Sequence, residues 1–394
     1  MYLLDNVIQE YAWGSRTAIA ELLGTQSPSP RPQAELWMGA HPSAPSRTQA
    51  GTLLELVEAD PRAVLGEAVH RRHGGRLPFL LKVLAAGAPL SLQAHPSLAQ
   101  AQEGFARENQ AGVAADAPHR NYKDANHKPE ILCALGPFDA LCGFRAALES
   151  AELLERLEVE ALAPVVESLR ASAGIRGAFE HLMHLPRERQ ERVASEVARA
   201  ARELPEAAPF AAERAWCVRL AQAYPGDIGA VVSLLLNLVR LKTGEAIYLP
   251  AGNLHAYLSG TGVELMASSD NVLRGGLTPK HVDVPELMRV LDFAPIAAEP
   301  LRAEQHPGGE QVYVTAAPDF RLSRWALAGS QVQPERRGPE LLLCTEGRAR
   351  LQAGSDVLEL PRGAAAFIPA STDAYALEGS GVVYRATVGA QEAP

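Results

Sequence analysis

The spacing of hydrophobic and polar positions changes twice along the chain. Residues 1–145 hold short apolar runs between many Gly and Pro residues, and the runs at 76–86 and 88–96 predict strands bounded by turns. From about residue 146 to 240, apolar residues recur at helical spacing with charged residues between them. Short apolar runs then return and continue to the C-terminus. The pattern predicts a mainly β chain interrupted by a helical part, with smaller helices at 51–66 and within 278–293.

One local pattern occurs twice, at 244–258 (GEAIYLPAGNLHAYL) and at 363–377 (GAAAFIPASTDAYAL). Each copy places a Pro six residues after a Gly, with an apolar strand between them. Glycine permits a tight bend and proline ends a strand ladder, which is typical of antiparallel barrels of the jelly-roll or cupin type. Five residues after the Pro, the first copy has His255 and the second has Ala374.

These observations predict a mainly β fold with two cupin-like (jelly-roll) β-barrels and an inserted α-helical domain. Since His306 is the last histidine of the chain, we expect no imidazole metal site in the second barrel. The first barrel is expected at 1–145 plus 241–295 and the helical domain at 146–240. The second barrel, without metal, is expected at 296–394.

Length and composition narrow the functional classes. The 394 residues exceed one ordinary core, so two or three domains are expected. The net charge of −9, with no concentrated basic stripe, argues against nucleic acid as a partner. No apolar run reaches the roughly 20 residues that span a bilayer, and the N-terminus lacks a signal-peptide pattern. We therefore expect a cytoplasmic protein, and its four cysteines, which form no CxxC pair, are expected to be reduced core residues.

Four polar residues are candidates for a metal site. Gln93 and His95 lie two apart on a predicted strand, so both side chains leave the same face. Glu130 begins an apolar run, and His255 follows the first copy of the repeated turn. Imidazole and oxygen ligands suit Zn²⁺, and also Fe²⁺ or Mn²⁺. Spacing alone leaves open both a metal site and four unrelated polar residues.

Several charges stand where an apolar residue or a plain loop is expected. Lys82 interrupts an apolar run, where it needs an anion or a carboxylate partner unless its side chain reaches the surface. Lys128 lies two residues before Glu130. Three further charges, Asp270, Arg274 and Lys280, lie around a Gly-Gly turn. Arginine binds phosphate or an enediolate well, so one interpretation is an anion-binding site. The other is an ordinary solvated loop.

Seven motifs occur together in a fixed order along the first three-quarters of the chain. They are YAWG (11–14), AELWMGAHP (34–42), PFLLKVL (78–84), PLSLQAHP (89–96), NHKPE (126–130), LPAGNLHAYL (249–258) and GVELMASSDNVLRGGLTPKHVD (262–283). In these motifs the chain resembles the type I mannose-6-phosphate isomerases. After about residue 295 the resemblance is limited to a barrel-like pattern.

The resemblance implies two cupin-like barrels with an inserted helical domain, and one Zn²⁺ per chain. Its zinc ligands would be Gln93, His95, Glu130 and His255. It implies a catalytic role for Arg274, which would stabilise an enediolate or orient the substrate. The candidates for proton transfer are Lys128, Asp270, His127 and Glu264. Lys82 and, more weakly, Lys280 are expected to bind the substrate phosphate.

The implied reaction interconverts mannose 6-phosphate and fructose 6-phosphate through a cis-enediol(ate), with a proton moved between C2 and C1. The expected partner is a small phosphorylated sugar, and a monomer is expected. Two alternatives stay open. Two histidines and a carboxylate also occur in non-haem iron oxygenases, although Gln93 as a fourth ligand and the phosphate-friendly cations argue against this class. The second alternative is a protein that binds a sugar without converting it.

Overall fold

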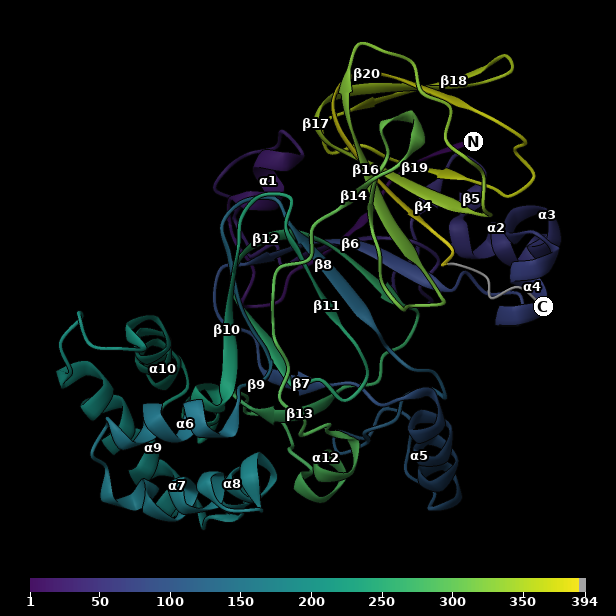
Figure 1. Cartoon of the computed structure of the whole chain (residues 1–394). Helices are drawn as coiled ribbons and strands as arrows, with labels where there is room; N and C mark the ends of the chain where they lie inside the picture. Colours follow the sequence, from purple (N-terminus) through teal and green to yellow (C-terminus); the bar gives the residue numbers. More distant parts are fainter. Residues whose placement is uncertain (390–394) are drawn as a thin grey trace.

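The computed structural model describes residues 1–389; residues 390–394, the end of the expected second barrel, lie outside the described residues. Two large β-sheets and a group of helices make up the molecule (Figure 1). The helices α6–α10 gather at the lower left of Figure 1, away from the sheet of the C-terminal part at the upper right. Among residues 1–389, no helix has both the length and the apolar character needed to cross a membrane.

The first sheet has ten strands and holds the candidate metal ligands. Its main path runs β10-β9-β12-β6-β3-β2, and β7, β8, β11 and β13 join it at the sides. The long central strand β12 pairs along its length with β6, β7, β8 and β9. The strand bounds are β2 Val7–Gln9, β3 Glu35–Met38, β6 Phe79–Ala86, β7 Leu92–Ala94, β8 Glu130–Ala134, β9 Phe138–Phe144, β10 Leu236–Leu241, β11 Ala246–Leu249, β12 His255–Ala267 and β13 Leu273–Gly276.

The second sheet has eight strands, in the order β1-β19-β17-β20-β16-β15-β14, with β18 on β17. All but one come from the C-terminal part of the chain. The bounds are β1 Tyr2–Leu4, β14 Glu304–Gln305, β15 Gln311–Tyr313, β16 Arg321–Ala328, β17 Glu340–Ala353, β18 Asp356–Pro361, β19 Ala365–Ile368 and β20 Ala376–Thr387. A two-stranded ribbon, β4 Arg47–Thr48 with β5 Gly51–Thr52, forms a third, small sheet.

Two boundaries differ from the expected division. The N-terminal strand β1 belongs to the second sheet, because Tyr2–Leu4 pair with β19. The helical part ends before residue 240, because β10 begins at Leu236 and pairs with β9 of the first sheet. Both differences have one cause: strand partners are chosen by long-range pairing, which leaves no mark in the local spacing of apolar residues.

The helices follow the expected pattern with one split. The run at 51–66 forms two helices because Asp60 caps a new helix that begins at Pro61. Amphipathic spacing accounts for the helical part, where α9 buries one face through residues such as Val193, Val197 and Ala201. The bounds are α1 Ala18–Leu22, α2 Leu53–Ala59, α3 Pro61–Leu65, α4 Glu67–His73, α5 Leu98–Gln110, α6 Ala147–Glu155, α7 Ala163–Arg170, α8 Gly174–His184, α9 Arg187–Glu203, α10 Ala211–Ala223, α11 Gly229–Val232 and α12 Val284–Val290.

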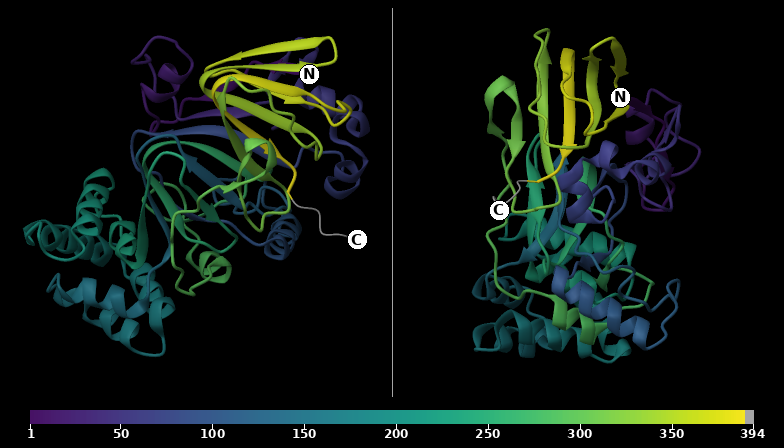
Figure 2. Two further views of the ribbon diagram at one scale, coloured as in Figure 1. Left: turned by 45° about the horizontal axis from the view of Figure 1, so that its top comes forward. Right: turned by 90° about the vertical axis from the view of Figure 1, so that its right-hand side faces the viewer.

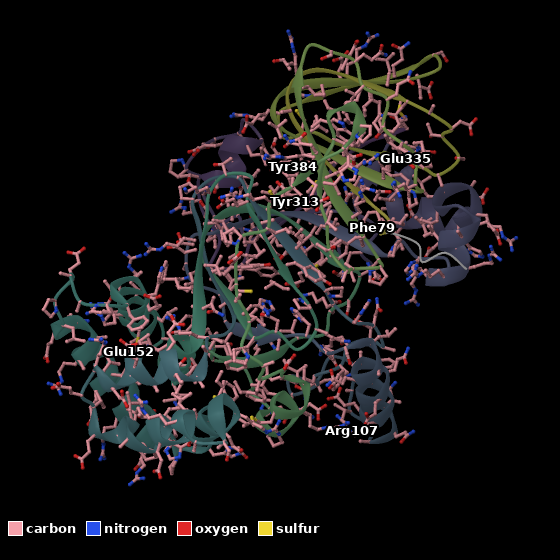
Figure 3. The ribbon with its side chains drawn as sticks, in the orientation of Figure 1. Phe79, Arg107, Glu152, Tyr313, Glu335 and Tyr384 are labelled. Carbon is pink, nitrogen blue, oxygen red and sulfur yellow. The ribbon has the colours of Figure 1, made fainter. Side chains whose placement is uncertain are left out.

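The two sheets share a buried core where they meet. Side chains of the first sheet, such as Leu81 and Ile131, belong to one apolar cluster with Phe367 of the second. Within this contact, the Sγ of Cys133 lies 2.9 Å from the hydroxyl of Tyr313 and 3.4 Å from that of Tyr384. Figure 3 shows both tyrosines where the sheets meet, and Figure 2 shows the second sheet standing above the first. All four cysteines are free and buried.

The repeated pattern forms the same local structure twice. Gly244 and Gly363 both have positive φ, +83° and +85°, so each turn needs the freedom of glycine. Each is followed by a short strand, β11 in the first sheet and β19 in the second, and then by a long strand, β12 or β20. The repeat therefore marks corresponding places in the two sheets.

Candidate active site

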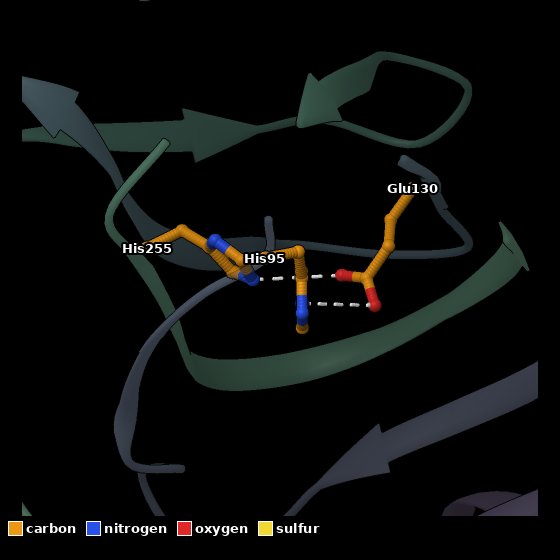
Figure 4. A group of neighbouring side chains, drawn as sticks. All are labelled: His95, Glu130 and His255. Atoms are coloured by element: carbon orange, nitrogen blue, oxygen red, sulfur yellow. Dashed lines mark ion pairs between the residues drawn. The ribbon is translucent and has the colours of Figure 1, made fainter. Parts of the chain in front are cut away.

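Three strand ends bring His95, Glu130 and His255 together. His95 directly follows β7, Glu130 begins β8 and His255 begins β12. The Nε2 atom of His95 lies 3.3 Å from one carboxylate oxygen of Glu130, and that of His255 lies 3.5 Å from the other. The three side chains converge (Figure 4), and they form a group that is able to hold a metal ion. Gln93 is the register partner of His255, which brings the fourth expected ligand onto the neighbouring strand.

The ligand atoms of these residues are prepared for a cation. The Nδ1 atom of His95 lies 2.7 Å from the backbone oxygen of Asn271, and that of His255 lies 3.0 Å from the oxygen of Asn253. These contacts fix the tautomer with Nδ1–H as donor, so each Nε2 carries a free lone pair. Both Nε2 atoms and Oε2 of Glu130 are buried, and none of them has a hydrogen-bond partner among residues 1–389. Buried polar atoms are normally satisfied, so this donor set fits a metal such as zinc.

The charge states of His95 and Glu130 suit metal binding. Burial lowers the pKa of His95 to about 4, although Glu130 opposes the shift, so the imidazole is neutral at pH 7. Burial would raise the pKa of Glu130, but Lys128 and the two histidines hold it well below its usual value. The Nζ atom of Lys128 lies 3.1 Å from Glu130. A neutral imidazole and an ionised carboxylate are the forms that coordinate a divalent cation.

A cavity of about 610 Å³ opens beside this group. Aromatic, acidic and basic side chains all contribute to its lining. The polar residues of the lining that the sequence pointed to are Lys82, Gln93, Lys128, Glu130, Glu264, Asp270, Arg274 and Lys280. Such a mixture of apolar walls and a few converging charges is typical of a small-molecule site.

Lys82 is buried between two carboxylates. Its Nζ lies 3.4 Å from Glu35 and 3.4 Å from Glu264. The alternative in which the side chain reaches the surface is therefore wrong, because Lys82 is only 6% exposed. Burial would lower the pKa of Lys82, but Glu35 and Glu264 raise it above its usual value. Burial raises the pKa of Glu264 to about 7, against the opposing effect of Lys82.

Arg274 and Lys280 form the cationic side of the cavity. Arg274 lies on β13, where its register partner is Gln93, so it stands one strand from the metal group. Burial lowers the pKa of Arg274, and burial together with Arg274 lowers that of Lys280. Neither cation forms an ion pair with a carboxylate in the described part of the chain. Asp270 also lines the cavity, and a hydrogen bond from His41 (3.2 Å) lowers its pKa.

His127 differs from the expectation. It does not line the cavity, and its Nε2 lies 2.7 Å from a carboxylate oxygen of Asp319, a residue of the C-terminal part. The reason is strand alternation: Lys128 and Glu130 leave one face of the extended chain, so His127 points to the other. The position of His127 argues against the proton-transfer role expected for it.

Several lining residues received no site role from the sequence, among them Glu35, Trp37, Tyr257 and Tyr224, and the first three belong to the motifs noted above. Glu35 and Trp37 lie two apart on β3, which sends both to one face, and Tyr257 follows His255 by two residues. The alternation was the available signal in each case. Tyr224 comes from the end of α10, and no local pattern connects it to the cavity.

Comparisons with known proteins identify the relatives of this chain. Mannose-6-phosphate isomerase of Shigella flexneri is 41% identical over 393 residues, which cover 98% of this chain and 99% of that protein. The chain belongs to the mannose-6-phosphate isomerase family. Two family profiles match separate parts: "Phosphomannose isomerase type I, catalytic domain" at residues 1–147 and "Mannose-6-phosphate isomerase, cupin domain" at residues 309–388.

Solved structures of the mannose-6-phosphate isomerase family have the same fold. A crystal structure of a variant of phosphomannose isomerase from Salmonella typhimurium matches with a TM-score of 0.92 at 38% identity, covering 99% of this chain and all of that one. A zinc-bound mannose 6-phosphate isomerase matches with a TM-score of 0.91 at 38% identity, covering 99% of each chain. The molecule therefore combines mostly β structure, including a cupin domain, with a helical portion.

Proposed function

We propose that this chain is a zinc-dependent isomerase that interconverts mannose 6-phosphate and fructose 6-phosphate. The observation that carries the proposal is the buried group His95, Glu130 and His255, which stands at a cavity lined by the cations Arg274 and Lys280. Within residues 1–389, the ligand atoms of this group have no hydrogen-bond partner and the two cations form no ion pair. The relatives named mannose-6-phosphate isomerase support the choice of substrate. A phosphorylated sugar matches the cavity in size and charge.

One Zn²⁺ would be held by His95, Glu130, His255 and Gln93. When bound, zinc polarises substrate oxygens and orients the open-chain sugar. The hydrogen bonds from each Nδ1 to a backbone oxygen keep the two imidazoles aimed at the ion. Lys128, beside Glu130, adds a positive charge close to where the C1 and C2 oxygens would bind.

Proton transfer between C2 and C1 needs a group whose pKa lies near the working pH. Glu264 meets this requirement, because burial raises its pKa to about 7 and it lines the cavity. We therefore favour Glu264 as the group that takes and returns the proton. Asp270 is less suited, because its pKa is lowered by His41. Lys128 remains a candidate through its position alone.

Arg274 and Lys280 would bind the negative charge of the substrate. Arg274, one strand from Gln93, is close enough to the metal group to stabilise an enediolate or the phosphate. Lys280 lies at the edge of the cavity and suits the phosphate. Lys82 is less suited to that role than expected, because Glu35 and Glu264 already neutralise it.

We infer the finer architecture in the same way. The two sheets correspond to two cupin-like barrels, with the helical part inserted into the first. The catalytic unit would be 1–145 plus 241–295, adjusted at β1 and β10, and the C-terminal unit would bind no metal. Action as a monomer in the cytoplasm stays a prediction.

The deciding experiment assays mannose 6-phosphate conversion by the purified chain before chelation, after verified removal of zinc and after zinc is restored. Activity should disappear and return. His255→Ala should abolish both zinc content and turnover, whereas His119→Ala, a change at an exposed histidine, should alter neither. Solvent deuterium should enter the product at C1 or C2. Zinc-loaded protein without turnover, or full turnover without zinc, would overturn the proposal.

A further inference from the structure

Asp319 connects the C-terminal part of the chain to the edge of the candidate active site. It lies between β15 and β16, and its side chain is 7% exposed. One carboxylate oxygen lies 2.7 Å from Nε2 of His127, and the other lies 3.9 Å from Nδ1 of His73 at the end of α4. The shorter contact is a hydrogen bond and the longer one is a weak ion pair at most. His127 is therefore the main partner of Asp319.

His127 belongs to the short segment that delivers Lys128 and Glu130. Because side chains alternate along an extended chain, Lys128 and Glu130 face the cavity and His127 faces away from it. On the preceding residue, the backbone oxygen of Asn126 accepts hydrogen bonds from the side chains of Asn271 (2.8 Å) and Ser269 (3.2 Å). Asp319 holds the outer face of the same segment.

We propose that Asp319 is a positioning residue for the reaction: through His127 it fixes the direction in which Lys128 and Glu130 enter the site. The catalytic part of this proposal rests on the proposed function. A buried carboxylate that accepts a hydrogen bond from a histidine holds the imidazole in one tautomer and one orientation. The C-terminal unit thereby contributes to the reaction by supporting one wall of the site in the other unit.

The surroundings of Asp319 make it a firm support. Its neighbour Phe320 is 1% exposed and Ala317 is 4% exposed, and both belong to the apolar cluster shared by the two sheets. The same shared core holds Ile131, the residue after Glu130. A movement of the carboxylate would therefore disturb packed side chains on both sheets, and interiors of this density resist such movement.

The test combines Asp319→Ala, Asp319→Asn, His127→Ala and the double variant. Removing a partner that is hydrogen-bonded directly to a metal ligand typically costs about 10- to 100-fold in activity or metal affinity; Asp319 acts one residue further out, through His127, so we expect the lower end of this range. For Asp319→Ala we expect kcat to fall at least about tenfold and zinc to be lost faster to a chelator. Asparagine still accepts the hydrogen bond from Nε2–H, so Asp319→Asn should keep kcat within about threefold. Asp356→Ala, at an exposed aspartate of the same sheet, is the matched control.

The double variant decides whether Asp319 acts through His127. If it does, adding Asp319→Ala to His127→Ala should change kcat less than about twofold. The proposal would be overturned if the fold-losses of kcat in the two single variants multiplied in the double variant. It would also be overturned if Asp319→Ala had wild-type kcat and wild-type zinc retention. If Asp319→Ala fails to fold, the comparison of Asp319→Asn with His127→Ala replaces it. Asp319→Asn keeps the hydrogen bond and should keep kcat, whereas His127→Ala removes the bond and should lower kcat; equal kcat values would overturn the proposal.

Amide hydrogen exchange gives a readout that does not depend on turnover. In zinc-free protein, peptides covering residues 126–130 should exchange faster in Asp319→Ala than in wild type, while peptides from the helical part should not change. Unchanged exchange at 126–130 would contradict the proposal even if the chain acted on another substrate. Wild-type protein without isomerase activity would instead remove the proposed function and leave this structural test intact.

Discussion

Glu130 and Glu340 occupy the same register position in the two sheets. Glu130 pairs with Leu249 on β11, and Glu340 pairs with Ile368 on β19. Leu249 and Ile368 in turn hold the same place in the repeated Gly–Pro pattern. The repeat therefore extends to the carboxylate that, in the first sheet, stands between two histidines.

The cations around the two carboxylates differ. Glu340 is completely buried, and its carboxylate lies 3.0 Å from Arg336 and 3.6 Å from Arg385. Tyr375 donates a hydrogen bond of 2.7 Å to it. Arg385 also contacts Glu310 at 2.5 Å. Guanidinium groups thus neutralise the C-terminal carboxylate, where the first sheet has an arrangement that fits a metal ion.

Replacing Arg385 by Met should strongly destabilise the protein. The change leaves the buried carboxylates of Glu310 and Glu340 without their shared counter-charge, and breaking a buried pair costs about 3–5 kcal/mol. Urea unfolding at pH 7 measures the loss. Arg350→Met, which removes an arginine paired at the surface, should cost no more than about 1 kcal/mol. Equal losses for the two variants would contradict this account of Arg385.

A second prediction concerns Ala374, the counterpart of His255. Ala374→His restores an imidazole to the second turn, but we expect the protein to bind no second zinc. Arg336, Arg385 and Tyr375 already contact the carboxylate of Glu340, so it is not free to bind a metal ion. Zinc per chain, measured by atomic absorption after dialysis, should remain at one. A content of two would show that the C-terminal site accepts a metal.

A feature of this site could be predicted from the sequence when it depends on residues close together in the chain, and not when it depends on residues far apart. Alternation and long motifs mark Gln93, His95, Glu130 and His255 locally, so the sequence could propose them as metal ligands; the structure brings His95, Glu130 and His255 together and places Gln93 beside His255. The counterpart of Glu130 was not, because Glu340 is identified only by its pairing with Ile368, and register between distant strands has no local signature. The missing histidine at Ala374 was visible, but the arginines that pair with Glu340 were not.

The same limit applies to the fold. Helical spacing located the helical part closely. The split of the run at 51–66 is explained by Asp60 and Pro61, which are typical of a helix start. The assignment of β1 to the second sheet could not be predicted, since Tyr2–Leu4 is too short to show any pattern. The direction of His127 followed from alternation, but its partner Asp319 lies 192 residues away.

The raised pKa of Glu264 predicts a pH effect on zinc-free protein. Its folded pKa of about 7 lies above the ordinary value of 4.5, so the folded state binds more protons between these values. Glu264 therefore contributes stability at low pH that is lost as pH rises from 4.5 to 7, by roughly 3 kcal/mol in total. His95, whose folded pKa is about 4 against 6.5, acts in the opposite direction between pH 4 and 6.5.

Because the two effects overlap, the informative quantity is the difference between wild type and Glu264→Gln. Relative to wild type, the variant should gain stability as pH rises from 4.5 to 7 and stay level above pH 8. Urea unfolding across this range, in the presence of chelator, measures the difference. Glu58→Gln, at an exposed glutamate of α2, supplies the control. A pH-independent difference would show that Glu264 has an ordinary pKa.

Lys280 offers the sharpest test of how the phosphate binds. It stands beside Arg274 and pairs with no carboxylate of residues 1–389. Losing one charged hydrogen bond to the phosphate weakens binding by about tenfold or more. Lys280→Ala should therefore raise the KM for mannose 6-phosphate about tenfold, while kcat stays within about threefold. Inhibition by inorganic phosphate should weaken in parallel, and Lys242→Ala, at an exposed lysine, should change neither. A fall in kcat at constant KM would instead assign Lys280 to the chemical step.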